Sequence, residues 1–403
     1  MISVEEALSR ILASLTATPV ETVSLAEADG RTLAADIASR RTQPPADVSA
    51  MDGYAVRAGD VATVPATLRL VGHAAAGGHH EGTLAAGEAV RIFTGAPLPA
   101  GADAIVIQED TERPDDAHVL VRESVSAGTY VRPAGLDFSA GDIGLEKGRR
   151  LGARDIGLAA AMNVPWLPVH RRPRVALLAT GDEIVRPGEP AGEDQIVSSN
   201  ALALAALVRA CGGEAVDLGI ARDRVDSLRE TARGAAGCDM LVTLGGASVG
   251  EHDLVQEALA PDGLDVDFWR IAMRPGKPLM FGRFADMAML GLPGNPVSSL
   301  VCGLIFLRPA LRALAGLPQD DPLRTIRLGS DLGGNDRRQD YLRTEVTVRD
   351  GERVALPFAR QDSSMLATIA RADGLIVRPP HAPPVRAGEL VPFLPFDQGL
   401  TGI

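Results

Sequence analysis

The sequence predicts an α/β protein with additional β domains: a doubly wound parallel-sheet module, an inserted small β domain, a linker β region and a C-terminal β domain. Three observations favour this class. Buried strands alternate with helices over about 145 residues from Arg172. Short strand-like runs fill residues 61–145 and return after Asp320. The 43 glycines and 28 prolines among 403 residues favour many turns over long helices.

The first predicted element is an amphipathic helix. Apolar residues recur at three and four positions over Val4–Leu15, Ser3 is a suitable N-cap, and Pro19 closes the segment. Residues 20–41 then predict short strands and residues 42–60 a loop. The next candidate strands, separated by Gly/Pro turns as in a small inserted β domain, are 67–71, 89–93, 104–108 and 119–121.

The α/β module follows Arg172. Its expected strands lie in "RVALLATGDEI", "EAVDLGIARD", "DMLVTLGGASVG" and "MAMLGLPGNP". Helices are expected after Ser199 or Asn200, ending near Gly212, and over Val225–Ala236 and Val297–Leu314. After Asp320 the runs "TEVTV", "GLIVRPP" and "GELVPFLPF" predict a second small β domain.

Composition excludes several classes of function. The net charge is −12 and no Lys/Arg block occurs, so nucleic-acid binding is not expected. Three widely spaced cysteines fit a reducing compartment, and the histidines show no ligand spacing for a transition metal. The N-terminus does not read as a signal peptide, and no apolar run approaches the roughly 20 residues of a membrane span. We therefore expect a cytoplasmic protein with no membrane partner.

Acidic residues follow two strands of the predicted sheet. "TGDEI" places Thr180, Asp182 and Glu183 after the first strand, and "GIARD" places Asp223 after the second. Ligands of such sheets bind at the carboxyl ends of the strands. These carboxylates are candidates for holding Mg²⁺ or receiving a proton, or they cap the following helices.

A glycine loop follows the third strand, in "LVTLGGASVGEHD". Gly245 and Gly246 allow backbone N–H groups to face an anion, and Ser248 and Gly250 extend the loop. A Walker-type phosphate loop would continue with lysine, whereas this loop continues with acids that include Asp253. A phosphate group would suit the backbone N–H groups of the loop, and a divalent cation bound with it would suit the acidic residues. The alternative is a tight turn with helix-capping acids.

Two cations occupy the stiff turn "RPGKP". Arg274 suits bidentate contacts with oxyanions, and Lys277 provides a compact charge. In an acidic chain this pair favours an oxyanion ligand. "LPGNPVSS" then places Asn295, Pro296 and Ser298 at the start of a helix, where Asn295 and Ser298 can cap and bind. No Gly-x-Ser-x-Gly elbow appears, which argues against acyl chemistry.

Together the motifs resemble one family. "SAMDGYAV", "RIFTGAP", "TGDEI", "TLGGASVGEHD", "RPGKP" and "LPGNPVS" occur in the order and spacing of the molybdopterin molybdenumtransferases, which are similar to the E domain of gephyrin. The resemblance covers essentially the whole chain. It implies an elongated multi-domain homodimer whose α/β module is of the molybdopterin-binding type. The implied reaction joins adenylylated molybdopterin and molybdate with Mg²⁺ to give molybdenum cofactor and AMP.

The resemblance also implies domain limits and site residues. The implied domains are 1–20 plus 172–318, 21–44 plus 146–171, 45–145 and 319–403. Asp52 and Thr94 would belong to the inserted domain that reaches the partner subunit's active site, and Asp137 would lie nearby. Asp182, Glu183, Asp223 and Asp253 would form an acidic, metal-binding set. The remaining implied residues would hold molybdate, phosphate or the cofactor. They are basic, carry a hydroxyl group or lie on tight turns: Thr180, Gly245, Gly246, Ser248, Gly250, Arg274, Lys277, Pro296, Ser298, Arg338, Arg343 and Ser363.

The sequence departs from the family pattern at a few positions. Ser198 and Ser199 stand where Asp-Ser is common, and Ala247 where valine is usual. Asp362 replaces a glycine and adds a negative charge beside Ser363.

Two alternative functions stay open at this point. One is a molybdopterin adenylyltransferase, which shares the α/β module, and the other is a non-enzymatic cofactor-binding scaffold. The expected partners are a second copy of the chain, a molybdopterin adenylyltransferase and maturation factors of molybdenum enzymes.

Overall fold

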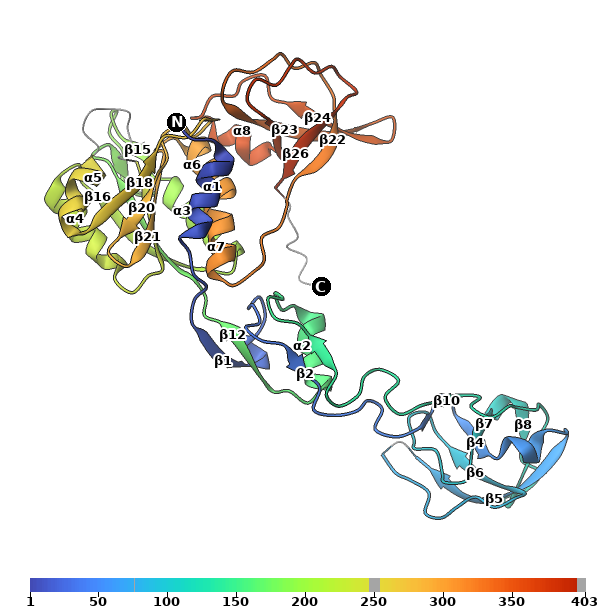
Figure 1. Ribbon diagram of the computed structural model, residues 1–403. Coiled ribbons are helices and arrows are strands. Elements are labelled where there is room, and N and C mark those ends of the chain that lie inside the picture. The colour runs from blue at the N-terminus through green and yellow to red at the C-terminus, as the bar shows by residue number, and fades with distance from the viewer. Residues whose placement is uncertain (76, 246–253, 397–403) are drawn as a thin grey trace. The chain divides into compact units, whose positions relative to one another are not determined.

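The computed structural model describes residues 1–75, 77–245 and 254–396 (Figure 1). The chain divides into two compact units. The inserted unit comprises Asp36–Glu146 and Arg154–Leu167, and the core unit comprises Met1–Ala35, Lys147–Ala153 and Pro168–Ile403. The predicted linker region is shared between the two units, so its standing as a separate domain stays a prediction.

The core unit contains the predicted α/β sheet. Its strand order is β16-β13-β17-β21-β20-β18. The first four strands are parallel, as predicted, but β20 runs antiparallel to both β21 and β18. The bounds are β13 (Arg174–Thr180), β16 (Glu214–Ala221), β17 (Met240–Leu244), β18 (Leu264–Trp269), β20 (Met280–Phe284) and β21 (Met287–Leu292).

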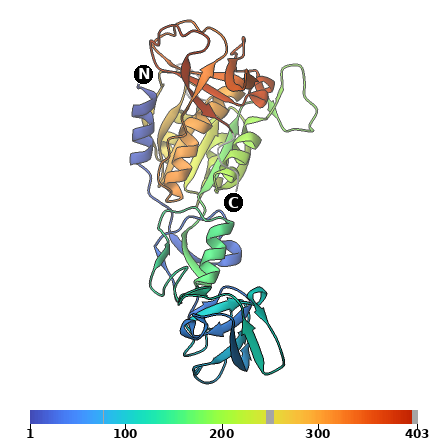
Figure 2. The ribbon, with the colours of Figure 1, turned by 90° about the vertical axis from the view of Figure 1, so that its right-hand side faces the viewer.

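Helices cover both faces of this sheet (Figures 1 and 2). One apolar core holds residues of α1, α3, α6 and α7, and a second holds residues of α4 and α5. The doubly wound arrangement is therefore confirmed. The bounds are α1 (Val4–Ala13), α3 (Asn200–Ala210), α4 (Val225–Ala232), α5 (Leu254–Leu259), α6 (Pro296–Cys302) and α7 (Arg308–Leu314).

Two predicted helix caps have different outcomes. Ser3 caps α1 as expected, because its hydroxyl oxygen accepts a hydrogen bond from the backbone N–H of Glu6 at 3.0 Å. Ser199 occupies the cap position of α3 but makes no side-chain cap hydrogen bond. Its hydroxyl instead lies 3.4 Å from Oδ1 of Asn200.

A long apolar helical run lies inside the core unit. Helices α6 and α7 join through a π-helical turn, Gly303–Leu307, into the 19-residue run Pro296–Leu314. This run is nearly as long as the membrane span that the sequence was expected to lack. It is, however, 61% buried within the protein and contributes Val301, Phe306 and Leu311 to the core. These contacts are those of a core helix.

The C-terminal part of the core unit forms the second predicted β region. Its strand order is β19-β23-β24-β22-β26-β25, and β25 also pairs with β23, so the sheet closes on itself. The first strand, β19, comes from the α/β module and pairs with β23. The bounds are β19 (Met273–Arg274), β22 (Arg324–Leu328), β23 (Gln339–Arg349), β24 (Glu352–Pro357), α8 (Leu366–Arg371), β25 (Gly374–Arg378) and β26 (Leu390–Pro395).

The inserted unit is built on a six-stranded sheet with the order β7-β4-β6-β5-β9-β8. Apolar residues form a separate core cluster on each side of it. The four strands predicted for this region are confirmed to within a few residues. The loop predicted over residues 42–60 is wrong in part, because β4 lies within it and pairs with β6 and β7. The bounds are β4 (Gly53–Val56), β5 (Ala66–Ala74), β6 (Glu88–Ile92), β7 (Ala104–Ile107), β8 (Thr111–Glu112) and β9 (His118–Val121).

Short strand pairs and turns complete the structure. The pairs are β1 (Val20–Ser24) with β12 (Trp166–His170), β2 (Ile37–Ala38) with β11 (Ile143–Leu145), β3 (Val48–Ser49) with β10 (Val131–Arg132), and β14 (Ile184–Val185) with β15 (Ile196–Val197). Helix α2 spans Ala153–Ala161. Short 3₁₀ turns lie at Leu25–Glu27, Ala58–Val61, Gln108–Asp110, Arg233–Ala235 and Ala260–Asp262.

Candidate functional site

Several loops meet at one edge of the α/β sheet. Strands β13, β16, β17 and β21 are parallel, so their carboxyl ends share this edge. Because β20 is antiparallel to β21, with Met280 opposite Gly291, the chain enters β20 at the same edge. The segment 270–279 therefore lies there too. The topology thus gathers these predicted residues: Thr180, Asp182, Glu183, Asp223, Gly245, Arg274, Lys277, Pro296 and Ser298.

The backbones of β13 and β17 come close together at Thr180 and Gly245. Thr180 is buried, and its hydroxyl donates to the carbonyl of Leu244 at 3.5 Å. Gly245 has a φ of +92°, and a Cβ added there would lie 2.9 Å from the carbonyl oxygen of Thr180. Only glycine fits this position without strain. The next predicted residues, Gly246, Ser248, Gly250 and Asp253, lie outside the residues that the structure describes.

Three carboxylates lie near one another at this edge. Oδ1 of Asp182 accepts a hydrogen bond from the backbone N–H of Asp223 at 3.4 Å. Partial burial raises the pKa of Asp223, and the negative charges of Glu183 and Asp182 raise it further. Among the described residues, no three acidic, histidine or cysteine side chains are close enough to hold a metal ion. Asp182, Glu183 and Asp223 therefore do not complete a metal site by themselves.

The raised pKa of Asp223 gives a prediction for stability. The folded chain binds the Asp223 proton more tightly than the unfolded chain, so ionisation destabilises the fold as the pH rises above the ordinary value of 3.8. Asp223→Asn should therefore raise the melting temperature slightly at pH 7 and leave it unchanged at pH 3. Thermal melts across this pH range test the effect. A variant that melts below the natural protein at pH 7 would contradict it.

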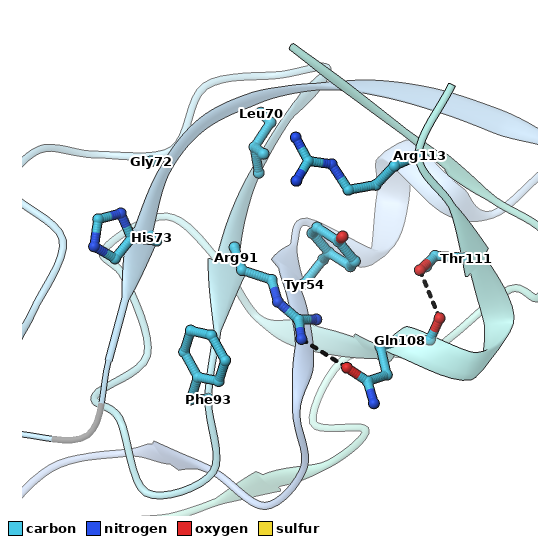
Figure 3. Close-up of a pocket in the computed structure, with 9 residues that line it drawn as sticks. All are labelled: Tyr54, Leu70, Gly72, His73, Arg91, Phe93, Gln108, Thr111 and Arg113. Atoms are coloured by element: carbon cyan, nitrogen blue, oxygen red, sulfur yellow. Dashed lines mark hydrogen bonds between the residues drawn. The ribbon is translucent and has the colours of Figure 1, made fainter. Parts of the chain in front are cut away.

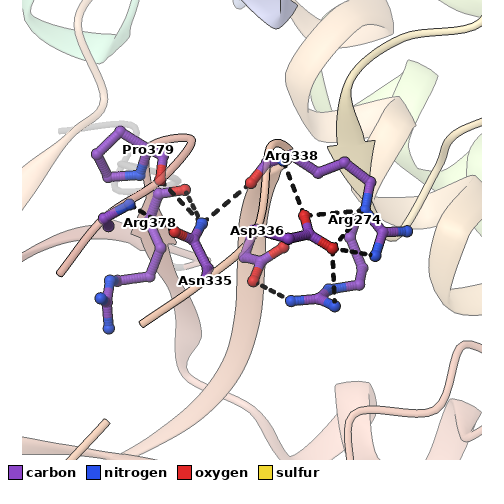
Figure 4. A network of polar contacts seen from close by, with 8 residues as sticks. Arg274, Asn335, Asp336, Arg338, Arg378 and Pro379 are labelled. Carbon is purple, nitrogen blue, oxygen red and sulfur yellow. Dashed lines mark hydrogen bonds and ion pairs between the residues drawn. The ribbon is translucent and has the colours of Figure 1, made fainter. Parts of the chain in front are cut away.

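The predicted cation Arg274 belongs to an ion-pair network (Figure 4). Its guanidinium pairs with Oδ2 of Asp340 and lies 3.8 Å from Oδ2 of Asp336. Arg338 donates to the same Asp336 oxygen at 2.6 Å, and this contact holds the pKa of Asp336 well below its usual range. Two carboxylates therefore already face the two arginines. Neither arginine is an uncompensated cation.

Asp340 is the buried member of this network. It is 3% exposed, and its Oδ1 atom is buried without a hydrogen-bond partner in the part of the chain that the structure describes. Its backbone pairs in register with Arg274, where β19 joins β23. Asp340 therefore holds the arginine of the α/β module against the C-terminal sheet.

Asp340→Asn should lower the free energy of unfolding by about 1–2 kcal/mol, because it removes the charge that faces Arg274. This is less than for a fully buried pair, since the Arg274 side chain is 47% exposed. Asp336→Asn is the matched control, and because that side chain is half-exposed it should cost less. Urea unfolding measures both. Equal costs for the two variants would contradict a special role for the buried carboxylate.

Lys277 differs from both arginines. Its side chain is half-buried, and no described residue forms an ion pair or hydrogen bond with its ammonium group. The chain has only two lysines, Lys147 and Lys277, beside many arginines. Lys277 is therefore the predicted cation at the sheet edge whose charge the described residues leave uncompensated.

The C-terminal part supplies a second loop to this region. Oγ of Ser363 accepts a hydrogen bond from the Asn295 amide at 3.1 Å, and its carbonyl accepts from the backbone N–H of Val297 at 3.1 Å. These bonds hold Ser363 beside the start of α6, where Pro296 occupies the first turn and Ser298 is buried. Asn295 occupies the predicted cap position of α6 but makes no side-chain cap hydrogen bond there. Nothing in the sequence signals its contact with Ser363, 68 positions away.

Arg343 is enclosed behind that loop. It is 1% exposed, and its guanidinium donates to the side chain of Gln361 at 3.1 Å and to the carbonyls of Arg360 and Met365. The sequence predicted a ligand contact, whereas the structure places Arg343 as a support for the loop 360–365. The added charge of Asp362 is directed at Ser364, whose N–H and hydroxyl donate to it at 2.9 and 2.6 Å.

The inserted unit brings Asp52 and Thr94 together. Oδ1 of Asp52 accepts hydrogen bonds from both the backbone N–H and the hydroxyl of Thr94, each at 2.7 Å. These two bonds lower the pKa of Asp52, and the charge of Arg91 adds to the effect. Asp137 lines a hollow of about 620 Å³ together with Gly95, which follows Thr94 in the chain, and Arg132.

Comparison with known proteins assigns each part of the chain. Residues 2–163 match the model of the MoeA N-terminal region (domain I and II), residues 176–313 a probable molybdopterin binding domain, and residues 325–396 the MoeA C-terminal region (domain IV). The fold is similar to two crystal structures of molybdopterin biosynthesis MoeA proteins from Pyrococcus horikoshii. Their TM-scores are 0.85 and 0.84, at 31% and 26% identity, and they cover 99% and 98% of this chain and 100% of each relative.

Two curated relatives carry the name molybdopterin molybdenumtransferase. The protein from Nostoc is 39% identical over 82% of this chain and 78% of its own length. The protein from Haemophilus influenzae is 32% identical over 98% of this chain and 99% of its own length. The similarity therefore extends over both β parts as well as the α/β module.

Proposed function

The chain belongs to the molybdopterin molybdenumtransferase family, and from this premise we propose that it transfers molybdenum from molybdate to adenylylated molybdopterin with release of AMP. The family regions include both β parts, which an adenylyltransferase built on the α/β module alone would not need. This extent favours the insertion reaction over the adenylyltransferase. The presence of Asp52, Asp253 and Lys277 at the motif positions favours it over a non-enzymatic scaffold.

The free charge of Lys277 is the observation that carries the proposal. Molybdate is a dianion and must approach a substrate that is itself anionic, so the site needs a cation that no carboxylate has neutralised. Arg274 and Arg338 already face Asp336 and Asp340. Lys277 lies at the same sheet edge without such a partner among the described residues, and its compact ammonium group suits an oxyanion.

We infer that the described side chains at this sheet edge act by positioning the reactants and not by forming covalent intermediates. The Thr180 hydroxyl donates to a backbone carbonyl, so no base activates it. Cys302 lies behind the "RPGKP" turn, with its sulfur 3.9 Å from the carbonyl oxygen of Gly276, and burial raises the pKa of its thiol. We therefore assign catalysis to electrostatic stabilisation and to the alignment of the two anions.

Magnesium enters the proposal only as a partner of the acidic residues. Carboxylate oxygens are the donors that Mg²⁺ prefers, and the raised pKa of Asp223 is the behaviour of a carboxylate that a cation would stabilise. The described residues offer no complete set of three ligands, however. Substrate phosphates and water commonly complete the coordination of Mg²⁺, so the protein carboxylates need not hold the ion alone.

The inserted unit supplies the second part of the proposed site. Asp52 and Thr94 form one hydrogen-bonded pair, and the second carboxylate oxygen of Asp52 has no partner among the described residues. We propose that this pair acts at the sheet edge of a second copy, in a homodimer. We also place the protein in the cytoplasm, where an adenylyltransferase supplies its substrate and maturation factors of molybdenum enzymes receive the product.

The test is an insertion assay with purified protein. Adenylylated molybdopterin, molybdate and Mg²⁺ are supplied, and the product is measured by activation of an apo-molybdoenzyme together with release of AMP. We expect both signals to depend on molybdate and on the protein. A parallel reaction with molybdopterin and Mg·ATP tests the alternative, because adenylylated product in that reaction would support an adenylyltransferase.

A further inference from the structure

The inserted unit has a basic hollow of about 720 Å³ on its sheet (Figure 3). Residues of β4, β5 and β6, Phe93 directly after β6, and residues of the segment 108–113 line it. None of the nine lining residues is acidic, although acidic residues outnumber basic ones in the unit as a whole. The fold therefore gathers positive charge at this hollow: Arg91, Arg113 and, when protonated, His73.

Arg91 is held rigidly in the middle of the hollow. Its guanidinium lies 5.0 Å from the ring centre of Tyr54 and 4.9 Å from that of Phe93. It also donates to the side-chain oxygen of Gln108 at 2.7 Å and to the carbonyl of Gly53 at 3.1 Å. Because these contacts fix Arg91 in advance, a ligand would not have to immobilise it on binding.

Arg113 and Phe93 offer different chemistry at two ends of the hollow (Figure 3). Arg113 uses one terminal nitrogen for Asp116, at 2.9 Å to its carbonyl and 3.4 Å to its carboxylate. Its Nε and other terminal nitrogen have no partner among the described residues, so they are available to an anion. Phe93 is 37% exposed and provides an aromatic surface.

The hollow adjoins the Asp52–Thr94 pair. Phe93 immediately precedes Thr94 in the chain, and the backbone N–H of Gln108 donates to the carbonyl of Asp52 at 3.1 Å. A molecule in the hollow would therefore lie beside the catalytic pair proposed for this unit. The volume and the two kinds of contact suit a flat ring system that carries a phosphate.

We propose that this hollow binds a planar heteroaromatic phosphate, namely the nucleotide or pterin part of the adenylylated substrate. Phe93 stacks against the ring, Arg113 contacts the phosphate, and Arg91 supplies the fixed positive charge between them. The choice of the nucleotide and the pterin as the two possible rings rests on the proposed function. The binding of a planar anion rests on the hollow itself.

The test is equilibrium binding of AMP and of a pterin monophosphate to the full-length protein by calorimetry. Arg113→Ala should weaken binding about tenfold, and Phe93→Ala about threefold to tenfold. Arg122→Ala is the matched control, because Arg122 is also an exposed arginine of this sheet paired to an acid, with Glu112, but does not line the hollow. It should leave binding unchanged.

The outcomes separate the possible ligands. Loss of AMP affinity alone assigns the hollow to the nucleotide, and loss of pterin affinity alone assigns it to the pterin. If neither ligand binds the natural protein, or if Arg113→Ala and Phe93→Ala bind both ligands as tightly as Arg122→Ala, the proposal is overturned. The insertion assay on the natural protein tests the proposed function separately, because its result does not depend on these variants.

Discussion

Lys277→Ala is expected to lower the rate of molybdenum insertion about 100-fold or more. The variant removes the cation of the "RPGKP" turn that no described carboxylate neutralises. Loss of a single electrostatic stabiliser in an active site commonly costs about 10²–10³ in rate. The apparent affinity for molybdate should fall as well, because the ammonium group would act on the oxyanion in the ground state. Initial rates measured across molybdate concentrations give both quantities.

The sequence offers a matched control for this experiment. Lys147 is the other lysine of the chain, also belongs to the core unit, and is exposed. Lys147→Ala should keep the insertion rate of the natural protein. Lys277→Arg preserves the charge but spreads it over a larger planar group, so we expect a partial loss. Full activity of Lys277→Ala would refute the assignment of the oxyanion contact to this residue.

Asp52→Ala is expected to reduce insertion by roughly 100-fold, a typical effect for a positioned acid–base group. Thr94 engages one carboxylate oxygen of Asp52 with two hydrogen bonds, which fixes the carboxylate and keeps it ionised. The second oxygen is left to act on a ligand. Folding should change little, because Asp52 is exposed. Insertion rates and thermal melts of the same samples test both statements.

Asp52→Ala removes a carboxylate that accepts a hydrogen bond from a backbone N–H. Asp103→Ala is the matched control, because it removes the same kind of contact at another position of the inserted unit. Asp103 is another exposed aspartate of the inserted unit, and it accepts a hydrogen bond from the N–H of Ala58 at 2.7 Å. It should change the insertion rate little.

Thr94→Val removes one of the two bonds to Asp52, so the pKa of Asp52 should rise and the acid limb of the pH–rate profile should move to higher pH. An unchanged profile would show that Asp52 does not titrate in the reaction.

The sequence predicted which residues belong to the site better than it predicted which residues they contact. The apolar runs of β13, β16 and β17 ended in acids and glycines, so Thr180, Asp223 and Gly245 could be placed at the strand ends. The pairing of Arg274 with Asp340 could not be predicted, because the two residues lie 66 positions apart and meet only through β19 and β23. The burial of Arg343 was missed for the same reason. The arginine pattern in the sequence indicates a positive charge. It does not show which carbonyl groups will surround the guanidinium in the folded chain.

What the sequence alone determined was the fold class, the family and the chemical character of the loops. Hydrophobic periodicity and turn residues act over short stretches, so they can be read without a structure. The tertiary structure decided which of the two cations of the "RPGKP" turn is free. The antiparallel β20 turns the "RPGKP" segment back to the edge where the parallel strands end, and the C-terminal sheet then places acids against Arg274 and none of the described ones against Lys277. Charge compensation depends on distances between remote residues, and only the folded chain sets those distances.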